Sequence, residues 1–132
     1  MTDLEIVRKV VREKAQTILN ANDRIWEYAE LAYHEFQSAD LLCNILSEEG
    51  FTVQKGLAGI PTCFTATWSK GSGKPVMGIL GEYDALSSLS QKAATPTAEP
   101  IEQGGNGHGC GHCSLGAGAL GAVLAIKAYL EE

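Results

Sequence analysis

Hydrophobic residues recur at intervals of three and four along the first third of the chain, a pattern that predicts amphipathic helices. The first helix is expected to begin at a capping box formed by Thr2 and Glu5, with a weak break at residues 20–23. A second helix is expected over residues 38–49. It should end at Gly50, because glycine favours the left-handed conformation that follows a last helical turn. The pattern therefore predicts two N-terminal helices.

After the second helix, the hydrophobic period changes from that of a helix to that of a strand. Short strands are expected over residues 51–54 and 62–68. Residues 75–81 (PVMGILG) are continuously apolar, as in a strand that is covered on both faces. That strand would end just before Glu82 and Asp84. Ligands of open α/β sheets lie beyond the carboxyl ends of strands, so these two carboxylates are candidate site residues.

The last third of the chain combines a long loop with a helix. Residues 87–113 have no clear period, and loops of that length are mostly functional or mobile. A helix is expected from Ser114 to residue 129 or 130. The stripe predicted to be buried on it consists of Leu115, Ala119, Ala122, Ile126 and Tyr129. The prediction is thus an α/β fold in one domain over residues 1–132, with two N-terminal helices, about three strands, the loop and a C-terminal helix.

Charge and composition narrow the classes of partner. The 132 residues carry a formal net charge of −6, which argues against binding to nucleic acid or to an anionic membrane surface. The longest uncharged apolar run, residues 113–126, is shorter than the ~20 residues of a membrane span. The residues after Met1 do not have the pattern of a signal peptide, so we expect a cytoplasmic protein with reduced cysteines.

Candidate chemistry is concentrated in residues 104–113 (GGNGHGCGHC), where glycines alternate with His108, Cys110 and His112, and Cys113 follows. The C-x-x-C spacing from Cys110 to Cys113 permits thiol–disulfide chemistry, but no buried strand leads into it, and the chain continues for only 19 residues after it. Nucleophilic catalysis by Cys110 would need a third group to orient His112, and none is evident.

Metal binding is the third interpretation of residues 104–113. Thiolate and imidazole are ligands for zinc and similar ions, and the glycines let the backbone fold closely around an ion. Glu82 and Asp84 are available as oxygen ligands or as hydrogen-bond partners of ligands. This reading accounts for the alternation of cysteine and histidine, which a merely structural turn does not require.

Three stretches carry a resemblance to a known family. Residues 106–112 (NGHGCGH), with the Gly- and Ala-rich helix after them, resemble the metal-binding motif of aminoacylase-like and carboxypeptidase-G-like metallopeptidases. Residues 26–36 are similar to the N-terminal helix and turn of that family, and residues 81–86 (GEYDAL) to its strand-end aspartate motif. The stretches occur in the order of the family, and the p-aminobenzoyl-glutamate hydrolases are the most similar branch.

The resemblance implies roles for individual residues. Cys110 and His112 would be metal ligands, and Asp84 would be the catalytic aspartate that orients a ligand. Glu82 occupies a position at which other branches have a histidine ligand. Together with His108 and Cys113, it would contact the ligands or the substrate. Two divalent ions, zinc or manganese, would occupy a complete site.

The resemblance also implies a fold and an activity. The chain would be the N-terminal portion of an α/β/α zinc-peptidase-type catalytic domain. The family hydrolyses the amide bond of N-acyl or N-aroyl amino acids or small peptides by a metal-activated water. Its general base and remaining ligands lie downstream of every position matched in this chain. We therefore expect a partial catalytic domain, inactive alone, that self-associates through exposed edges. The alternative is a non-enzymatic metal-binding or interaction module.

Overall fold

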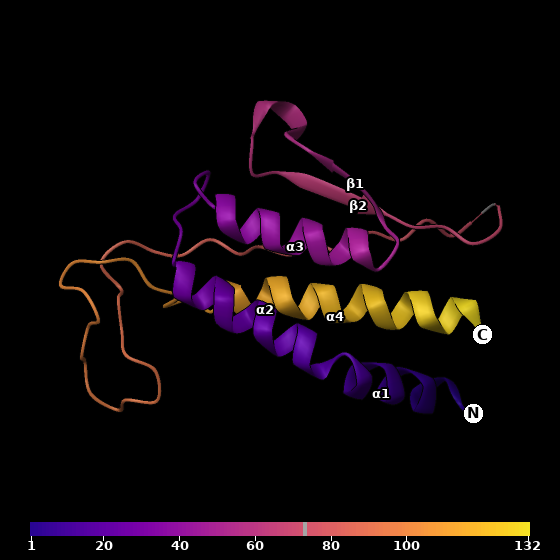
Figure 1. The fold of residues 1–132 in the computed structure, drawn as a ribbon, viewed down its shortest axis with the longest axis horizontal. Helices are drawn as coiled ribbons and strands as arrows, with labels where there is room; N and C mark the ends of the chain where they lie inside the picture. The colour runs from indigo at the N-terminus through magenta and orange to yellow at the C-terminus, as the bar shows by residue number, and fades with distance from the viewer. Residues whose placement is uncertain (73) are drawn as a thin grey trace.

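The computed structural model describes residues 1–72 and 74–132. Within this part of the chain, four α-helices and one two-stranded antiparallel sheet form a small mixed α/β fold (Figure 1). In chain order the elements are α1 (Asp3–Glu13), α2 (Ala15–Tyr28), α3 (Phe36–Glu48), β1 (Thr52–Lys55), a short 3-10 helix η1 (Leu57–Gly59), β2 (Phe64–Thr67) and α4 (His112–Glu131).

The elements are stacked in layers around α4. In Figure 1 the β1–β2 hairpin covers α3, and α3 lies over α4 and α2. α4 contacts each of the other three helices. The buried core cluster joins α2, α3 and α4 through Ala21, Ile25, Leu42, Leu46, Cys113, Leu120 and Leu124.

Local signals in the N-terminal half are largely confirmed. Thr2 and Glu5 form both hydrogen bonds of the capping box. Gly50 has a φ of 85° and follows α3, and its N–H donates to the Ser47 carbonyl at 3.0 Å. The N–H of Phe51 donates to the Leu46 carbonyl at 2.9 Å, which completes a Schellman motif.

The predicted break at residues 20–23 is wrong. The helix is interrupted at Lys14 instead, so three helices precede the hairpin rather than two. Residues 20–23 stay helical because Ala21 and Ile25 are fully buried in the core, and this packing outweighs the weak helix propensity of the asparagines around them.

The buried face of α4 also differs from the prediction. Leu115 and Tyr129 are exposed, whereas the buried residues are Cys113, Gly116, Ala117, Leu120, Gly121, Leu124 and Ala125. α4 is apolar on nearly every side, so its period does not identify a face. Small residues determine the choice, because they let neighbouring segments approach closely.

The third predicted strand, over residues 75–81, does not form. The segment belongs to neither a helix nor a sheet, and Val76 and Leu80 are almost fully exposed. No backbone group of residues 75–84 has a backbone hydrogen-bond partner among the described residues. A strand covered on both faces needs neighbouring strands, and the sheet described here consists of β1 and β2 alone.

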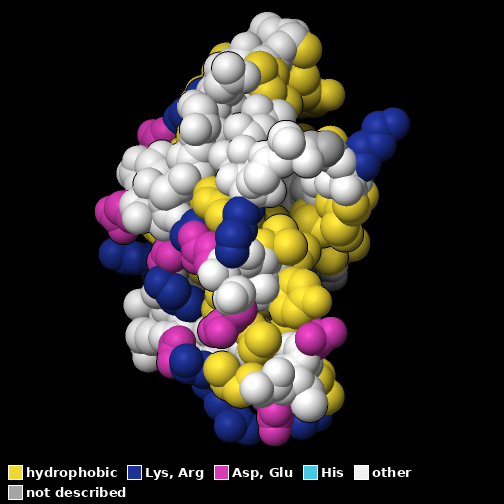
Figure 2. All heavy atoms as spheres, turned by 90° about the vertical axis from the view of Figure 1, so that its right-hand side faces the viewer, with side chains coloured by type: hydrophobic (Ala, Val, Ile, Leu, Met, Phe, Trp, Pro, Cys, Tyr) yellow, Lys and Arg dark blue, Asp and Glu magenta, His cyan; other side chains and the backbone are white. Residues whose placement is uncertain are grey.

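Hydrophobic surface is also exposed elsewhere. Figure 2 shows the end of the molecule at which both termini lie, where hydrophobic side chains are interspersed with charged ones. An apolar groove of about 370 Å³ runs between α1 and α4 and is lined by Asp3, Val7, Ala122, Ala125, Ile126 and Tyr129.

By length and composition alone, α4 could cross a membrane. Core helices of globular domains meet the same criteria, and one face of α4 is buried against α1, α2 and α3. Length and composition are therefore weak evidence for a span, and the expectation that the chain does not cross a membrane stays a prediction.

Residues 75–81, which were predicted to form a strand, contact α4 through their last residue, Gly81. This contact is testable. A Cβ atom at Gly81 would lie 2.9 Å from Ala119 Cβ. We therefore expect Gly81→Ala to lower the free energy of unfolding by about 1–3 kcal/mol, through overpacking. Urea denaturation followed by circular dichroism measures the change.

Gly118→Ala is the matched control for this substitution, because a Cβ at Gly118 meets no atom within 4 Å. It should stabilise the protein by up to about 1 kcal/mol through helix propensity. Equal stabilities of the two variants would contradict the close contact.

Candidate functional site

The candidate site lies where the first turn of α4 meets residues 81–84, the turn after α2 and the hairpin. A pocket of about 350 Å³ opens there. Its wall consists of Ala32, Tyr33, Glu35, Ile60, Thr62, Cys63, Gly81, Glu82, Tyr83, Asp84 and His112. Three of the residues singled out from the sequence, Glu82, Asp84 and His112, therefore line one pocket.

His112 is the centre of this group. Its Nδ1 lies 2.8 Å from Asp84 Oδ1, and its Nε2 lies 3.4 Å from Glu82 Oε2. The side chains of His112 and Asp84 are 18% and 23% exposed, whereas that of Glu82 is 69% exposed. A carboxylate accepts only, so Asp84 favours the tautomer with the proton on Nδ1 and leaves Nε2 as an electron-pair donor.

Close packing against α4 brings Asp84 to His112. A Cβ at Gly116 would lie 3.2 Å from Tyr83 Cβ and 3.4 Å from the Glu82 carbonyl oxygen. The absence of side chains at Gly81 and Gly116 lets the two backbones approach one turn beyond His112. The Asp84 carboxylate can then reach the start of the helix.

Backbone hydrogen bonds fix the residues that follow Asp84. The Ala85 N–H donates to the Glu30 carbonyl at 2.7 Å. Leu86 and Gly107 exchange two N–H···O bonds of 3.0 Å each, which bind the glycine-rich loop to the same segment. A Cβ at Gly107 would lie 2.0 Å from the Leu89 carbonyl oxygen, so only glycine fits there.

Tyr83 links residues 81–84 to the hairpin region of the pocket. Its hydroxyl donates to the Thr62 carbonyl at 2.6 Å, and its ring packs beside Phe64. Burial raises the pKa of the Tyr83 hydroxyl, with the charge of Glu35 as a further cause, so the group stays protonated and remains a donor. Thr62 in turn donates to Glu35 Oε2 at 2.7 Å.

Glu30 has a role that the sequence patterns did not indicate. Its carboxylate accepts from the Gln37 N–H at 2.9 Å, from the Ser38 N–H at 2.9 Å and from the Ser38 hydroxyl at 2.8 Å. It therefore caps α3, whose own N-cap residue, Glu35, makes no side-chain capping bond. The expected start at residue 38 is thereby corrected: α3 begins at Phe36, and Ser38 lies inside the helix, bonded to Glu30.

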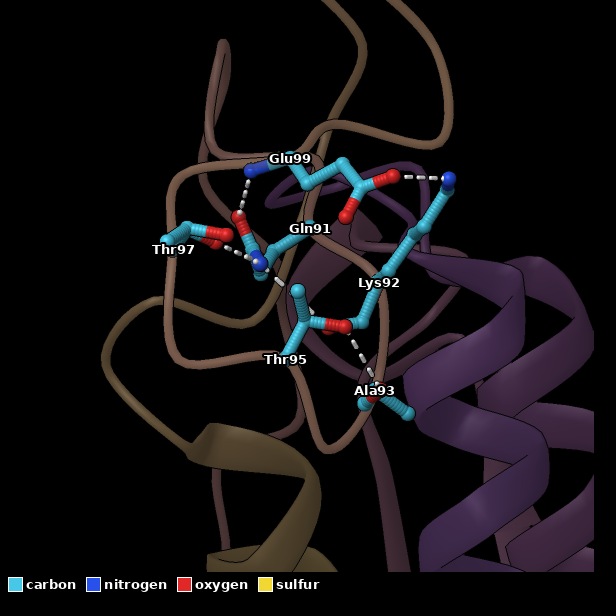
Figure 3. Close-up of polar contacts among 6 residues, drawn as sticks. All are labelled: Gln91, Lys92, Ala93, Thr95, Thr97 and Glu99. Carbon is cyan, nitrogen blue, oxygen red and sulfur yellow. Dashed lines mark hydrogen bonds and ion pairs between the residues drawn. The ribbon is translucent and has the colours of Figure 1, made fainter.

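The long loop before α4 has internal order over residues 91–99 (Figure 3). The Gln91 side chain donates to the Thr97 carbonyl and accepts from the Glu99 N–H, both at 2.9 Å. Lys92 forms an ion pair with Glu99, and the Lys92 N–H donates to the Glu99 carbonyl. All of these contacts join residues within 91–99, so this part of the loop is ordered by its own hydrogen bonds and ion pair.

The other candidate residues of the glycine-rich loop do not converge on the pocket. His108 Nε2 bonds to the Ile25 carbonyl at 2.9 Å, and its buried Nδ1 has no partner in the described part of the chain. Burial lowers the pKa of His108. Cys110 is exposed, and Cys113 is buried in the core, where its Sγ lies 3.9 Å from Ser114 Oγ.

The residues that are present fit part of a metal site. Histidines that bind metals usually donate their other ring N–H to a carboxylate, as His112 does to Asp84. Catalytic zinc takes three protein ligands, yet residues 1–72 and 74–132 contain no cluster of three side chains placed to bind one ion. The metal-binding roles of Cys110 and His112 stay predictions.

Three relatives place the chain among known proteins. It is 46% identical over 110 residues to a subunit of p-aminobenzoyl-glutamate hydrolase of Escherichia coli, covering 83% of this chain and 22% of the relative. It is 30% identical over 143 residues to Xaa-Arg dipeptidase of Mus musculus (98% and 29%). It is 28% identical over 125 residues to thermostable carboxypeptidase 1 of Saccharolobus solfataricus (94% and 31%).

The resemblance derived from the motifs is thereby confirmed. The chain spans between 22% and 31% of the length of these relatives. No protein-family model matches it.

The cap that Glu30 provides for α3 is testable. Ser38 is fully buried, so Glu30→Ala would leave its hydroxyl and N–H without their acceptor. We expect the free energy of unfolding to fall by about 2–3 kcal/mol in urea denaturation. Glu27→Ala is the control, because Glu27 pairs with Arg24 only at the surface, and we expect a change below ~0.5 kcal/mol. A similar, small effect for both variants would refute the capping role.

Thiol reactivity is expected to follow burial. Cys110 should be alkylated first by iodoacetamide, because it is exposed. Cys43, whose pKa is raised by burial, and Cys113 should react only after unfolding. Peptide mass spectrometry measures the order, and Cys110→Ser should abolish the rapid phase. A reversible disulfide between Cys110 and Cys113 would instead support thiol–disulfide chemistry.

Proposed function

Since the chain is a homologue of the amidohydrolases and peptidases that include p-aminobenzoyl-glutamate hydrolase, we propose that it carries part of a metal-dependent hydrolytic site. His112 and Cys110 are the proposed metal ligands, and Glu82 supplies a further oxygen. Asp84 is the residue that orients His112. In the complete site a divalent ion, zinc or manganese, would lower the pKa of a water molecule and polarise the scissile carbonyl.

The proposal is supported above all by the hydrogen bond between Asp84 and His112. It fixes the imidazole ring and holds the proton on Nδ1, so the lone pair of Nε2 is free for an ion. Glu82 Oε2, 3.4 Å from Nε2, adds negative charge on the same side. Cys110 precedes His112 by two residues and is exposed.

The proposed substrates are N-acyl or N-aroyl amino acids or small peptides. The names of the three relatives all denote cleavage of a bond to an amino acid or between amino acids. In this chain the pocket combines the carboxylates of Glu82 and Asp84 with apolar wall residues, including Tyr33 and Ile60. Such a wall suits the acyl or aryl part of the substrate, with the amide near His112.

We further propose that the 132-residue chain is inactive alone. Of the three proposed ligands, only His112 and Glu82 lie together in the described residues, whereas a catalytic ion takes three ligands and an open position. The same shortage favours a second candidate, a non-enzymatic module that binds a metal weakly or interacts with another protein. The two candidates differ in one expectation: only the first gains hydrolytic activity when a second protein supplies the remaining ligands and the general base.

Metal titration tests the proposed ligands. We expect zinc or manganese to bind weakly in isothermal titration calorimetry, and His112→Ala to weaken binding by about tenfold or more. His34→Ala is the control, because His34 lies in the exposed turn after α2 and bonds only to the Ala32 carbonyl. Equal affinity of the two variants would remove His112 from the site.

Activity is tested on the same preparation. With p-aminobenzoyl-glutamate and zinc or manganese, we expect turnover at least ~10³-fold below the ~10 s⁻¹ of a typical enzyme. Rapid hydrolysis by the homogeneous chain would show that the described residues suffice and would overturn the proposed inactivity.

A further inference from the structure

His108 joins the glycine-rich loop to the last turn of α2. Its Nε2 lies 2.9 Å from the Ile25 carbonyl oxygen. A carbonyl only accepts, so Nε2 carries the proton and His108 is the donor. The Ile25 side chain is fully buried in the core cluster, which holds this turn of α2 in place. His108 is therefore attached to the core four residues before His112.

The chain is attached to α2 again just after the candidate site. Cys113 is buried in the core cluster that includes Ile25. The Ser114 hydroxyl donates to Asn22 Oδ1 at 2.9 Å. Asn22 and Ile25 are three positions apart, which places them on one side of the helix. The four residues 109–112 thus lie between two attachments to the same side of α2.

The backbone between these attachments has little stiffness of its own. It contains two glycines, and Gly111 has a φ of 76°, a conformation that residues with a side chain rarely adopt. The Gly111 N–H donates to the His108 carbonyl at 3.1 Å, so His108 also begins the turn that leads into α4. Because ordering a flexible backbone costs conformational entropy, the position of this turn depends on contacts at its ends.

The His112 side chain is sensitive to the position of that turn. Its Nδ1 bonds to Asp84 at 2.8 Å, and Asp84 belongs to a different segment of the chain. The bond lasts only while residues 109–112 and Asp84 keep their relative position. Attachment of His108 to α2 fixes one of these two partners, and the packing of Gly81 and Gly116 fixes the other.

We infer that His108 is a positioning residue: its bond to the Ile25 carbonyl places the turn that carries His112, so that the imidazole meets Asp84 and keeps Nε2 as an electron-pair donor. The bond between Ser114 and Asn22 supports the same turn from its other end. The placing of the imidazole follows from these contacts alone. Its consequence for metal affinity rests on the proposed function.

The tautomer of His112 in the metal-free chain tests this role. In ¹⁵N NMR at mildly alkaline pH, His112 of the wild type should hold its proton on Nδ1. His108→Leu removes the donor, and we expect the signal of a single tautomer to be replaced by an average of the two. His108→Gln should retain the wild-type signal, because its amide N–H can donate to the Ile25 carbonyl.

Urea denaturation of the same variants separates positioning from stability. If His108→Leu is less stable but keeps His112 in the Nδ1 tautomer, His108 is only structural and the inference is overturned. Asn22→Ala decides the question if His108→Leu does not fold, and it should shift the His112 signal in the same direction. Its matched control is Asn20→Ala on the same helix, since Asn20 accepts only from Gln16 at the surface. Identical His112 signals in these two variants would exclude the second attachment.

Cobalt(II) titration followed by optical absorption tests the consequence for metal binding. We expect His108→Leu to raise the dissociation constant by about tenfold and His108→Gln to leave it near the wild-type value. If the wild type binds no cobalt but His108→Leu still loses the single tautomer, the positioning role stands and the proposed function fails. If cobalt binds and neither readout responds to His108→Leu, the positioning role fails and the proposed function stands.

Discussion

The contact between residues 81–84 and the first turns of α4 determines where the candidate site residues lie. It depends on two glycines, because a Cβ at Gly81 would collide with Ala119 and a Cβ at Gly116 would be in tight contact with Tyr83. The absent Cβ atoms let this segment lie directly on the helix, and Asp84 then meets His112 at hydrogen-bond distance. Gly116 lowers the intrinsic stability of α4, and the close packing that it permits offsets this cost.

Contacts with Glu30 also fix the position of the residues that follow Asp84. Glu30 uses its carbonyl to hold Ala85 and its carboxylate to cap α3. The turn between α2 and α3 is therefore mechanically linked to the residue after Asp84. Ser38, buried and bonded to Glu30, connects this link to the core. The candidate site is thus supported by two helices that contribute no residue to its chemistry.

Sequence patterns predicted those features that depend on local chemistry. The capping box at Thr2 and the helix end at Gly50 are specified within a few residues, and both form. Residue types also singled out Glu82, Asp84 and His112, and these three side chains line one pocket, although their roles in metal binding and catalysis stay predictions. Features that depend on neighbours were not predictable in this way. The apolar surface of α4 surrounds the helix and selects no face, and the cap from Glu30 acts over seven and eight positions.

The strand predicted at residues 75–81 also depends on neighbouring segments, which is why the prediction failed. This segment adjoins the candidate site. A continuously apolar strand is a sequence suited to burial on both faces, and the β1–β2 hairpin does not supply that cover. Among the described residues, the donor set at His112 is likewise short of the three ligands of a catalytic ion. The uncovered apolar segment and the incomplete set of ligands are neighbours in the chain, because Glu82 directly follows residues 75–81. Glu82 lies 3.4 Å from His112, so a strand that pairs with residues 76–80 would lie close to the candidate site. Covering these apolar residues would therefore also change the surroundings of His112.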